Sequence, residues 1–186
     1  MHRFLKQYIH MVNQLNDGIG KLAGWLTTGM VFLICFDVIA KFIAPKLDIH
    51  YSNTAVFEMQ WHIFALVFLL GIAYTLRHDR HVRVDLFYSK FSPKGKAWVN
   101  LIGVLLFLLP FCFIVIETSL TYVKNSYLMN EKSPDPGGLP YRFVLKGMII
   151  VGFALLALQG IALLFKSLLT ITEKGDEQEA VEVSKH

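Results

Sequence analysis

Four long apolar segments, separated by shorter charged ones, dominate the pattern of hydrophobic and polar positions along this chain. The hydrocarbon core of a bilayer is about 30 Å thick and a helix rises about 1.5 Å per residue, so a membrane span needs about 20 mostly apolar residues. The pattern therefore predicts an all-α integral membrane protein with four transmembrane helices. The expected spans are residues 22–43, 55–76, 97–119 and 143–164.

Two segments outside these spans have the pattern of amphipathic helices that lie at a membrane surface. In residues 3–17 the apolar side chains recur at helical spacing, and Asp17-Gly18 ends the pattern. In residues 82–96 aromatic and apolar residues alternate with basic ones. We expect an N-terminal interfacial helix over the first segment and a membrane-surface arm over the second.

A simple domain organisation follows from this pattern. Residues 1–172 are expected to form a single four-helix membrane domain. Residues 173–186 are acidic and polar, which predicts a disordered tail. The first apolar segment is too long for the hydrophobic part of a signal peptide, so we expect it to stay in the protein as a membrane anchor.

The composition supports a membrane protein and offers no sign of catalysis. Hydrophobic residues make up 54% of the chain and charged residues 17%, whereas a soluble domain usually has about a quarter charged residues. The two cysteines lie inside apolar segments, where a buried thiol acts as a small hydrophobic group. No glycine-rich phosphate loop, CxxC pair or HExxH sequence occurs, so we expect no enzymatic activity, cofactor or metal.

The distribution of basic residues predicts the orientation in the membrane. Twelve Lys and Arg residues lie in the N-terminal segment, the loop between spans two and three, and the tail, while six lie in the other two loops. Basic residues in short loops mark the cytoplasmic side. Both termini and the central loop are therefore expected in the cytoplasm. The net charge of +4 is explained by this bias, and no nucleic-acid partner is expected.

Ionisable residues inside the spans gather in one layer toward the outer leaflet. Such residues cost several kcal/mol in a membrane unless they are paired or hydrated. Two interpretations are open: interhelical ion pairs that fix the packing, or a path for an ion or substrate. The first is favoured because the inner halves of the spans are nearly all apolar. The layer consists of Asp37, Lys41, Glu58, His62, Glu117, Arg142 and Lys146.

The histidines do not indicate a haem or a metal site. A haem held between helices usually needs two axial ligands, and His62 is the one histidine well inside a span. His78 and His81 are separated by Asp79 and Arg80, with no cysteine nearby. Basic residues among them favour a solvated patch over a metal site.

The loop over residues 131–142 is the most distinctive stretch of the chain. Gly137 and Gly138 together with three prolines predict a tight turn that ends where the fourth span begins. Pro140 is well placed for the first turn of that helix.

At these residues the chain resembles the small membrane subunit (the Q or DctQ-type subunit) of the tripartite ATP-independent periplasmic (TRAP) transporters. The resemblance covers most of the chain and rests on four features in order. They are the size with four spans, Glu58-Met-Gln-Trp61 at the start of span two, His81-Val-Arg-Val-Asp85 after it, and Ser133-Pro-Asp-Pro-Gly-Gly-Leu-Pro-Tyr-Arg142 followed by Lys146.

The resemblance implies a scaffold rather than a transport path. Such subunits pair with a much larger membrane subunit, which carries the substrate and sodium sites and moves by an elevator mechanism. A periplasmic binding protein delivers the substrate, commonly an organic acid, and the complex lies in the bacterial inner membrane among its lipids. Four helices without an internal repeat or a discontinuous helix fit this role, because alternating-access transporters usually have both.

Two other functions are alternatives to the scaffold. The first is the membrane anchor of a respiratory oxidoreductase, binding haem or quinone, against which the single His62 argues. The second is a self-sufficient small homo-oligomeric transporter, which would work without a larger partner. The residues that we expect to stabilise the bundle or its interface are Asp37, Lys41, Glu58, Trp61, His62, Arg77, Arg83, Asp85, Glu117, Gly137, Gly138, Pro140, Tyr141, Arg142 and Lys146.

Overall fold

The computed structural model describes residues 2–49, 51, 54–79 and 91–183, and side chains as far as residue 172. The described residues contain helices, turns and loops, and no strand. The elements in chain order are α1 (His2–Ile43), the short 3₁₀ helix η1 (Ala44–Leu47), α2 (Thr54–Arg77), α4 (Pro93–Gly103), the π-helical segment η2 (Val104–Leu108), α5 (Leu109–Leu128) and α6 (Arg142–Val183).

Four of the helical rods that the structure describes are long and apolar enough to cross a membrane. The third rod is continuous from α4 through η2 to α5. The all-α fold with four transmembrane helices is therefore confirmed. The rods are His2–Leu47, Thr54–Arg77, Pro93–Leu128 and Arg142–Thr172.

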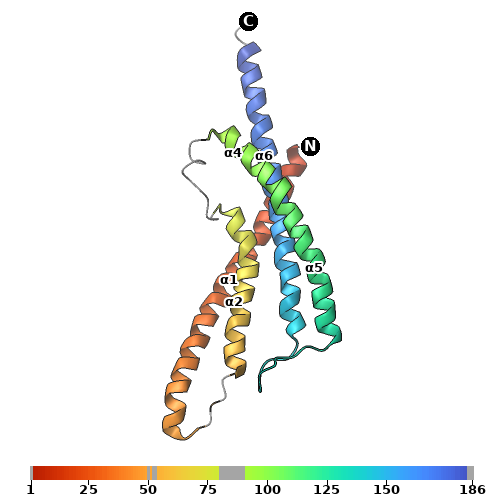
Figure 1. The fold of residues 1–186 in the computed structure, drawn as a ribbon. Coiled ribbons are helices and arrows are strands. Elements are labelled where there is room, and N and C mark those ends of the chain that lie inside the picture. Colours follow the sequence, from red (N-terminus) through yellow and green to blue (C-terminus); the bar gives the residue numbers. More distant parts are fainter. Residues whose placement is uncertain (1, 50, 52–53, 80–90, 184–186) are drawn as a thin grey trace.

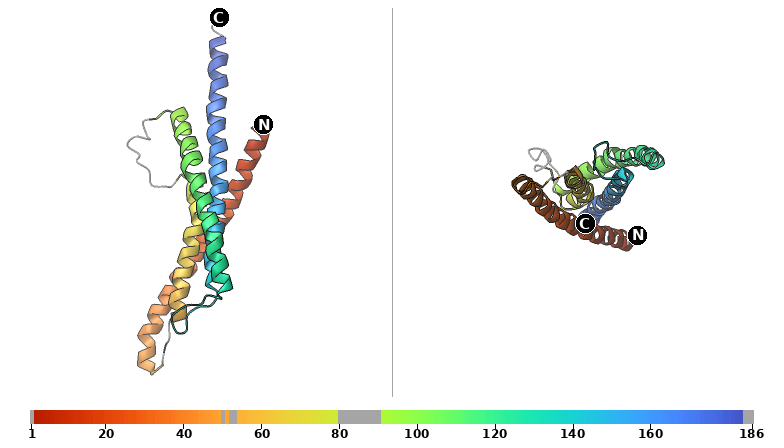
Figure 2. Two further views of the ribbon diagram at one scale, coloured as in Figure 1. Left: turned by 45° about the vertical axis from the view of Figure 1, so that its right-hand side comes forward. Right: turned by 90° about the horizontal axis from the view of Figure 1, so that it is seen from below.

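Helix α6 is the common neighbour of the other helices. It packs against α1, α2, α4, η2 and α5. Both termini lie at the same end of the molecule, which we call the termini end (Figure 1). Toward the other end, the loop end, the pair α1 and α2 diverges from the pair α5 and α6, as the two side views agree (Figure 2).

Small residues bring α6 close to its neighbours. A Cβ atom added at Gly152 would lie 2.8 Å from the backbone oxygen of Leu69 in α2. At Gly160 it would meet the side chain of Leu108. Ala162 is 1% exposed. Lipid tails are as apolar as the side chains, so helices in membranes associate through such close packing and through hydrogen bonds.

The first helix does not break at Asp17-Gly18, where the sequence pattern placed the end of an interfacial helix. Helix α1 is continuous from His2 to Ile43. A glycine inside a helix costs only about 1 kcal/mol, and the N-terminal part of α1 has tertiary contacts that hold it straight through this point. Val12 and Asn16 are 2% and 1% exposed, and the Tyr8 ring packs edge-on against Phe165 of α6.

Two further boundaries differ from the expected ones. The third rod begins at Pro93 rather than near residue 97, because the Ser92 hydroxyl accepts a hydrogen bond from the Gly95 N–H at 3.1 Å and caps the helix. Helix α6 continues to Val183, across most of the segment expected to be a disordered tail.

A π-helical turn precedes Pro110 in the third rod. Pro110 has no N–H and its ring crowds the preceding turn of helix. The chain widens over Val104–Leu108, and the Leu109 N–H bonds to the Val104 carbonyl, five residues back. The wider turn accommodates the proline without interrupting the rod.

Candidate functional site

The carboxylate of Glu58 joins α2 to the loop between α5 and α6. Glu58 is 2% exposed. Its Oε1 accepts a hydrogen bond from the Ser133 hydroxyl, and its Oε2 accepts one from the Leu139 N–H at 2.5 Å. An Nη atom of Arg142 lies 3.5 Å from Oε1. One buried side chain thus holds both ends of the loop, as backbone and hydroxyl donors satisfy its charge.

The backbone of this loop requires its glycines. Gly137 has a φ of 77°, in the left-handed region that glycine adopts without strain. A Cβ atom at Gly138 would lie 2.9 Å from the Glu58 Oε2 atom and closer still to Ser133. Tyr141 also has a positive φ, 62°, immediately before α6 begins. The predicted tight turn ending at the fourth span is therefore present, with Pro140 just outside the helix.

Two rings from α2 line the same region. The Arg142 guanidinium lies 5.6 Å from the centre of the Trp61 ring, a distance at which a cation is attracted to an aromatic face. The Trp61 ring lies 4.0 Å from the His62 ring. The His62 Nδ1 atom is 2.6 Å from the Glu58 carbonyl oxygen. His62 is therefore engaged with its own helix.

A second cluster lies beside the first and centres on Glu131. The Ser126 hydroxyl donates to its Oε2 at 2.6 Å, and the Lys146 ammonium donates to the same atom. Lys146 also lies 3.9 Å from the centre of the Tyr122 ring. The hydrogen bond from Lys146, followed by that from Ser126, lowers the pKa of the Glu131 carboxyl. The cluster ties the end of α5 to the first turns of α6.

Asp37 is the centre of a third cluster, between α1 and α2. It is 3% exposed. The Lys41 ammonium lies 2.6 Å from Oδ2, as the i,i+4 spacing predicts. Gln60 of α2 donates to the same oxygen at 3.2 Å, and the Tyr51 hydroxyl donates to Oδ1 at 3.3 Å. The three clusters each join neighbouring elements, although in the third the ion pair lies within α1 and the neutral side chains of Gln60 and Tyr51 make the link.

At the termini end, Arg77 joins the last turn of α2 to α1. Its guanidinium pairs with the Asp17 carboxylate and donates to the Asn13 carbonyl oxygen. The His78 Nε2 atom lies 3.4 Å from the same Asp17 oxygen. This pair gives Asp17 a role within the bundle and helps to explain why α1 continues through it.

A buried amide network between α1 and α6 was not expected from the sequence. The Asn16 side-chain amide donates to Gln159 Oε1 at 2.7 Å, and Gln159 donates to Asn13 Oδ1 at 3.2 Å. Asn16 and Gln159 are 1% and 5% exposed. The sequence contains one indication of this network, namely the amide of Gln159 within the apolar fourth span. Its partner lay in a segment assigned to the membrane surface.

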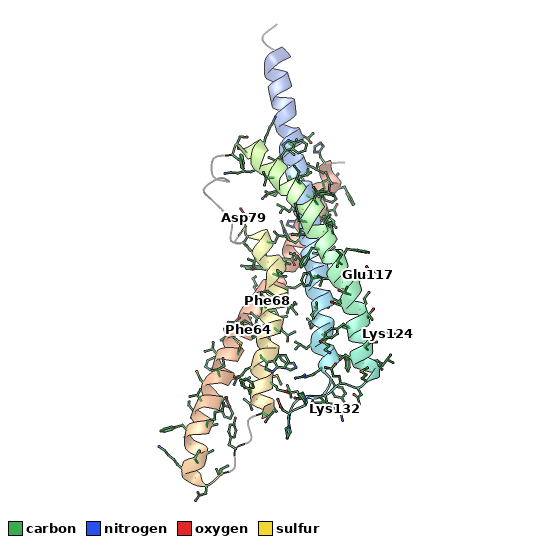
Figure 3. All side chains as sticks on the ribbon, viewed as in Figure 1. Phe64, Phe68, Asp79, Glu117, Lys124 and Lys132 are labelled. Carbon is green, nitrogen blue, oxygen red and sulfur yellow. The ribbon has the colours of Figure 1, made fainter. Side chains whose placement is uncertain are left out.

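One residue of the expected layer, Glu117, faces away from the other charged residues. Glu117 is exposed and points away from the bundle on α5 (Figure 3). Lys146 pairs instead with Glu131, which was not among the residues expected in the layer. Arg83 and Asp85, with most of the expected arm, lie outside the described residues.

The comparison with known proteins adds a family. The sequence profile described as "Tripartite ATP-independent periplasmic transporters, DctQ component" matches residues 30–170. No curated protein and no solved structure matches the chain. Among the described residues, no three His, Cys, Asp or Glu side chains are grouped so that they could hold a metal ion.

Proposed function

The chain belongs to the DctQ family of TRAP transporter components, and we propose that it acts there as a static scaffold subunit. In this role it pairs with the large elevator-type membrane subunit, and a periplasmic binding protein supplies the substrate. The complex takes up an organic acid with sodium. The complex works in the bacterial inner membrane, and the substrate and sodium sites lie in the other chains.

The observation that carries this proposal is the use of the buried charges. Asp37, Glu58 and Glu131 each have partners within the chain, in three clusters that join adjacent helices. A path for an ion or substrate needs groups whose partners can be exchanged along the membrane normal. Here the charges are fixed in place, and the helices between the two ends are packed through small residues. That combination supports a rigid body against which another subunit moves.

Co-purification tests the pairing. The chain would be tagged, expressed with its neighbouring genes and solubilised in a mild detergent, and the proteins that elute at equal stoichiometry would be identified. We expect one large polytopic membrane protein. Sodium-driven uptake into vesicles should need both membrane chains and the binding protein. Uptake by this chain alone, or elution of a stable homo-oligomer without a larger chain, would support the self-sufficient transporter instead.

The structure gives little support to the alternative function, the membrane anchor of an oxidoreductase. Its one axial ligand in a span would be His62, whose Nδ1 faces the Glu58 carbonyl oxygen at 2.6 Å. The remaining nitrogen could supply one ligand, and a second would have to come from elsewhere. An absorbance spectrum of the purified complex distinguishes the scaffold from the oxidoreductase anchor. A haem Soret band that shifts when the sample is reduced would contradict the scaffold.

We propose that both termini face the cytoplasm. The basic residues of the termini end support this orientation, and both termini lie there (Figure 1). Single cysteines in a chain that lacks Cys35 and Cys112 would test it. Lys132→Cys in the loop end should react with a membrane-impermeant maleimide in spheroplasts. Thr172→Cys should react only after lysis, and the opposite result would invert the topology.

A further inference from the structure

An amphipathic cleft of about 260 Å³ opens between α2, α5 and α6 toward the loop end. Its α2 wall consists of Trp61, Ala65 and Leu69, at successive turns of one helix face. The distance from Trp61 to Leu69 is therefore about 12 Å along the helix axis, since each of the eight residues rises about 1.5 Å. The cleft closes on the side of Leu69 toward the termini end, because Gly152 of α6 packs directly on the Leu69 backbone.

The end of the cleft near the loop is charged and aromatic. Arg142, Lys146 and Glu131 line it together with the rings of Trp61 and Tyr122. The Arg142 Nε atom is buried and has no hydrogen-bond partner among the residues that the structure describes. The chain therefore leaves part of this guanidinium unsatisfied, and a buried donor without an acceptor is costly.

The opposite end of the cleft is apolar. Leu145 and Ile149 of α6 face Ala65 and Leu69 of α2 across it. Polarity thus changes from charged to apolar along the direction in which a membrane changes from headgroup to hydrocarbon. A soluble anion would satisfy the charged end and leave the apolar walls uncovered, whereas an amphiphile covers both.

We propose that this cleft binds a membrane phospholipid whose headgroup carries both a phosphate and an ammonium group. The phosphate accepts hydrogen bonds from Arg142 and Lys146. The ammonium lies toward the Glu131 carboxylate and the rings of Trp61 and Tyr122, which attract cations. The first part of one acyl chain lies along Ala65 and the apolar wall.

The charge balance selects this class of headgroup. Two acidic and two basic side chains meet here, namely Glu58, Glu131, Arg142 and Lys146. Their formal charges cancel, so a ligand with a net negative charge gains little overall attraction. A zwitterionic headgroup can place each of its charges beside an opposite one.

Native mass spectrometry of the full chain in a mild detergent tests the site. The protein would be titrated with dioleoyl phosphatidylethanolamine, with dioleoyl phosphatidylglycerol, and with the soluble headgroup glycerophosphoethanolamine. Ala65→Phe fills the apolar end and leaves the Glu58 contacts intact, while Arg142→Gln removes the phosphate ligand. Val144→Phe enlarges a side chain of α6 that is 58% exposed, and it serves as the matched control.

We expect the wild-type chain and Val144→Phe to bind the ethanolamine lipid more tightly than the glycerol lipid. Ala65→Phe and Arg142→Gln should each weaken that binding about tenfold, which corresponds to about 1.4 kcal/mol. The soluble headgroup should neither bind nor displace the lipid. Equal binding by Ala65→Phe and the control would overturn the proposal. Displacement by the soluble headgroup would show an anion site, and a preference for the glycerol lipid would refute the zwitterionic headgroup.

Discussion

Replacing Gly152 with alanine should separate α6 from α2. The added Cβ would lie 2.8 Å from the Leu69 backbone oxygen and 3.1 Å from the Leu69 Cβ atom. Since the nearest atom belongs to the backbone, no side-chain rotation can relieve the contact, and the helices must move apart by several tenths of an ångström. Overpacking of this kind costs about 1–3 kcal/mol.

Gly147→Ala provides the matched control on the same helix. A Cβ atom at Gly147 would have no neighbour within 4 Å. Both substitutions gain the same helix propensity, which is up to about 1 kcal/mol in water. The difference between the two variants therefore isolates the overpacking, and we expect Gly152→Ala to be less stable than Gly147→Ala by about 1–3 kcal/mol.

Unfolding in mixed micelles would measure this difference. The helical signal in circular dichroism would be followed while the mole fraction of SDS is raised, and the free energies would be compared at a common SDS fraction. The double variant Gly152→Ala with Leu69→Ala should recover little, because the backbone oxygen remains in place. If the two glycine variants differ by less than about 0.5 kcal/mol, the close contact between α2 and α6 does not contribute to stability as argued.

Three further predictions concern the polar clusters. A double-mutant cycle with Asn16→Leu and Gln159→Leu, measured by the same unfolding assay, should give a coupling of about 0.6–1.7 kcal/mol, and strict additivity would contradict the buried bond. Glu58→Ala and Arg142→Ala should lower the yield of assembled transporter more than the apparent substrate affinity of the complexes that do assemble; a large affinity change with normal assembly would place these residues at the substrate. The lowered pKa of Glu131 means that its ionised form stabilises the fold above the ordinary pKa of 4.5 and that this contribution disappears as the pH falls through the lower folded value. The stability difference between wild type and Glu131→Gln should therefore be constant near neutral pH and shrink below pH 4.5, whereas a difference that persists at low pH would exclude the ion pair.

Hydropathy predicted the four spans but not the direction in which their side chains face. Glu117 and Glu131 show the difference. Both are acidic residues toward the loop end of the third rod, yet Glu117 is exposed on α5 while Glu131 binds Lys146. Each residue turns a helix face by about 100°, so an error in the facing direction moves a charge from the bundle to the lipid. The loop residues were better predicted, because glycine and proline restrict the backbone directly.

The continuity of α1 was missed for a related reason. Local signals at Asp17-Gly18 favour a helix end, while the contacts that hold the helix through this point come from residues far along the chain. Arg77 of α2 and Gln159 of α6 supply them. Tertiary contacts of this kind outweigh a local preference of about 1 kcal/mol, and a pattern read along one segment does not contain them.

The central place of α6 has a consequence for how the protein is made. During synthesis on a membrane-bound ribosome, α6 enters the bilayer after α1, α2, α4 and α5, all of which pack on it. Until α6 and the loop before it are in place, the Glu58 carboxylate lacks both the hydrogen bond from the Leu139 N–H and the neighbouring Arg142 guanidinium. A chain that stops before this loop therefore carries an unsatisfied acid in its second span, and we expect membrane proteases to degrade such a chain faster than the complete one.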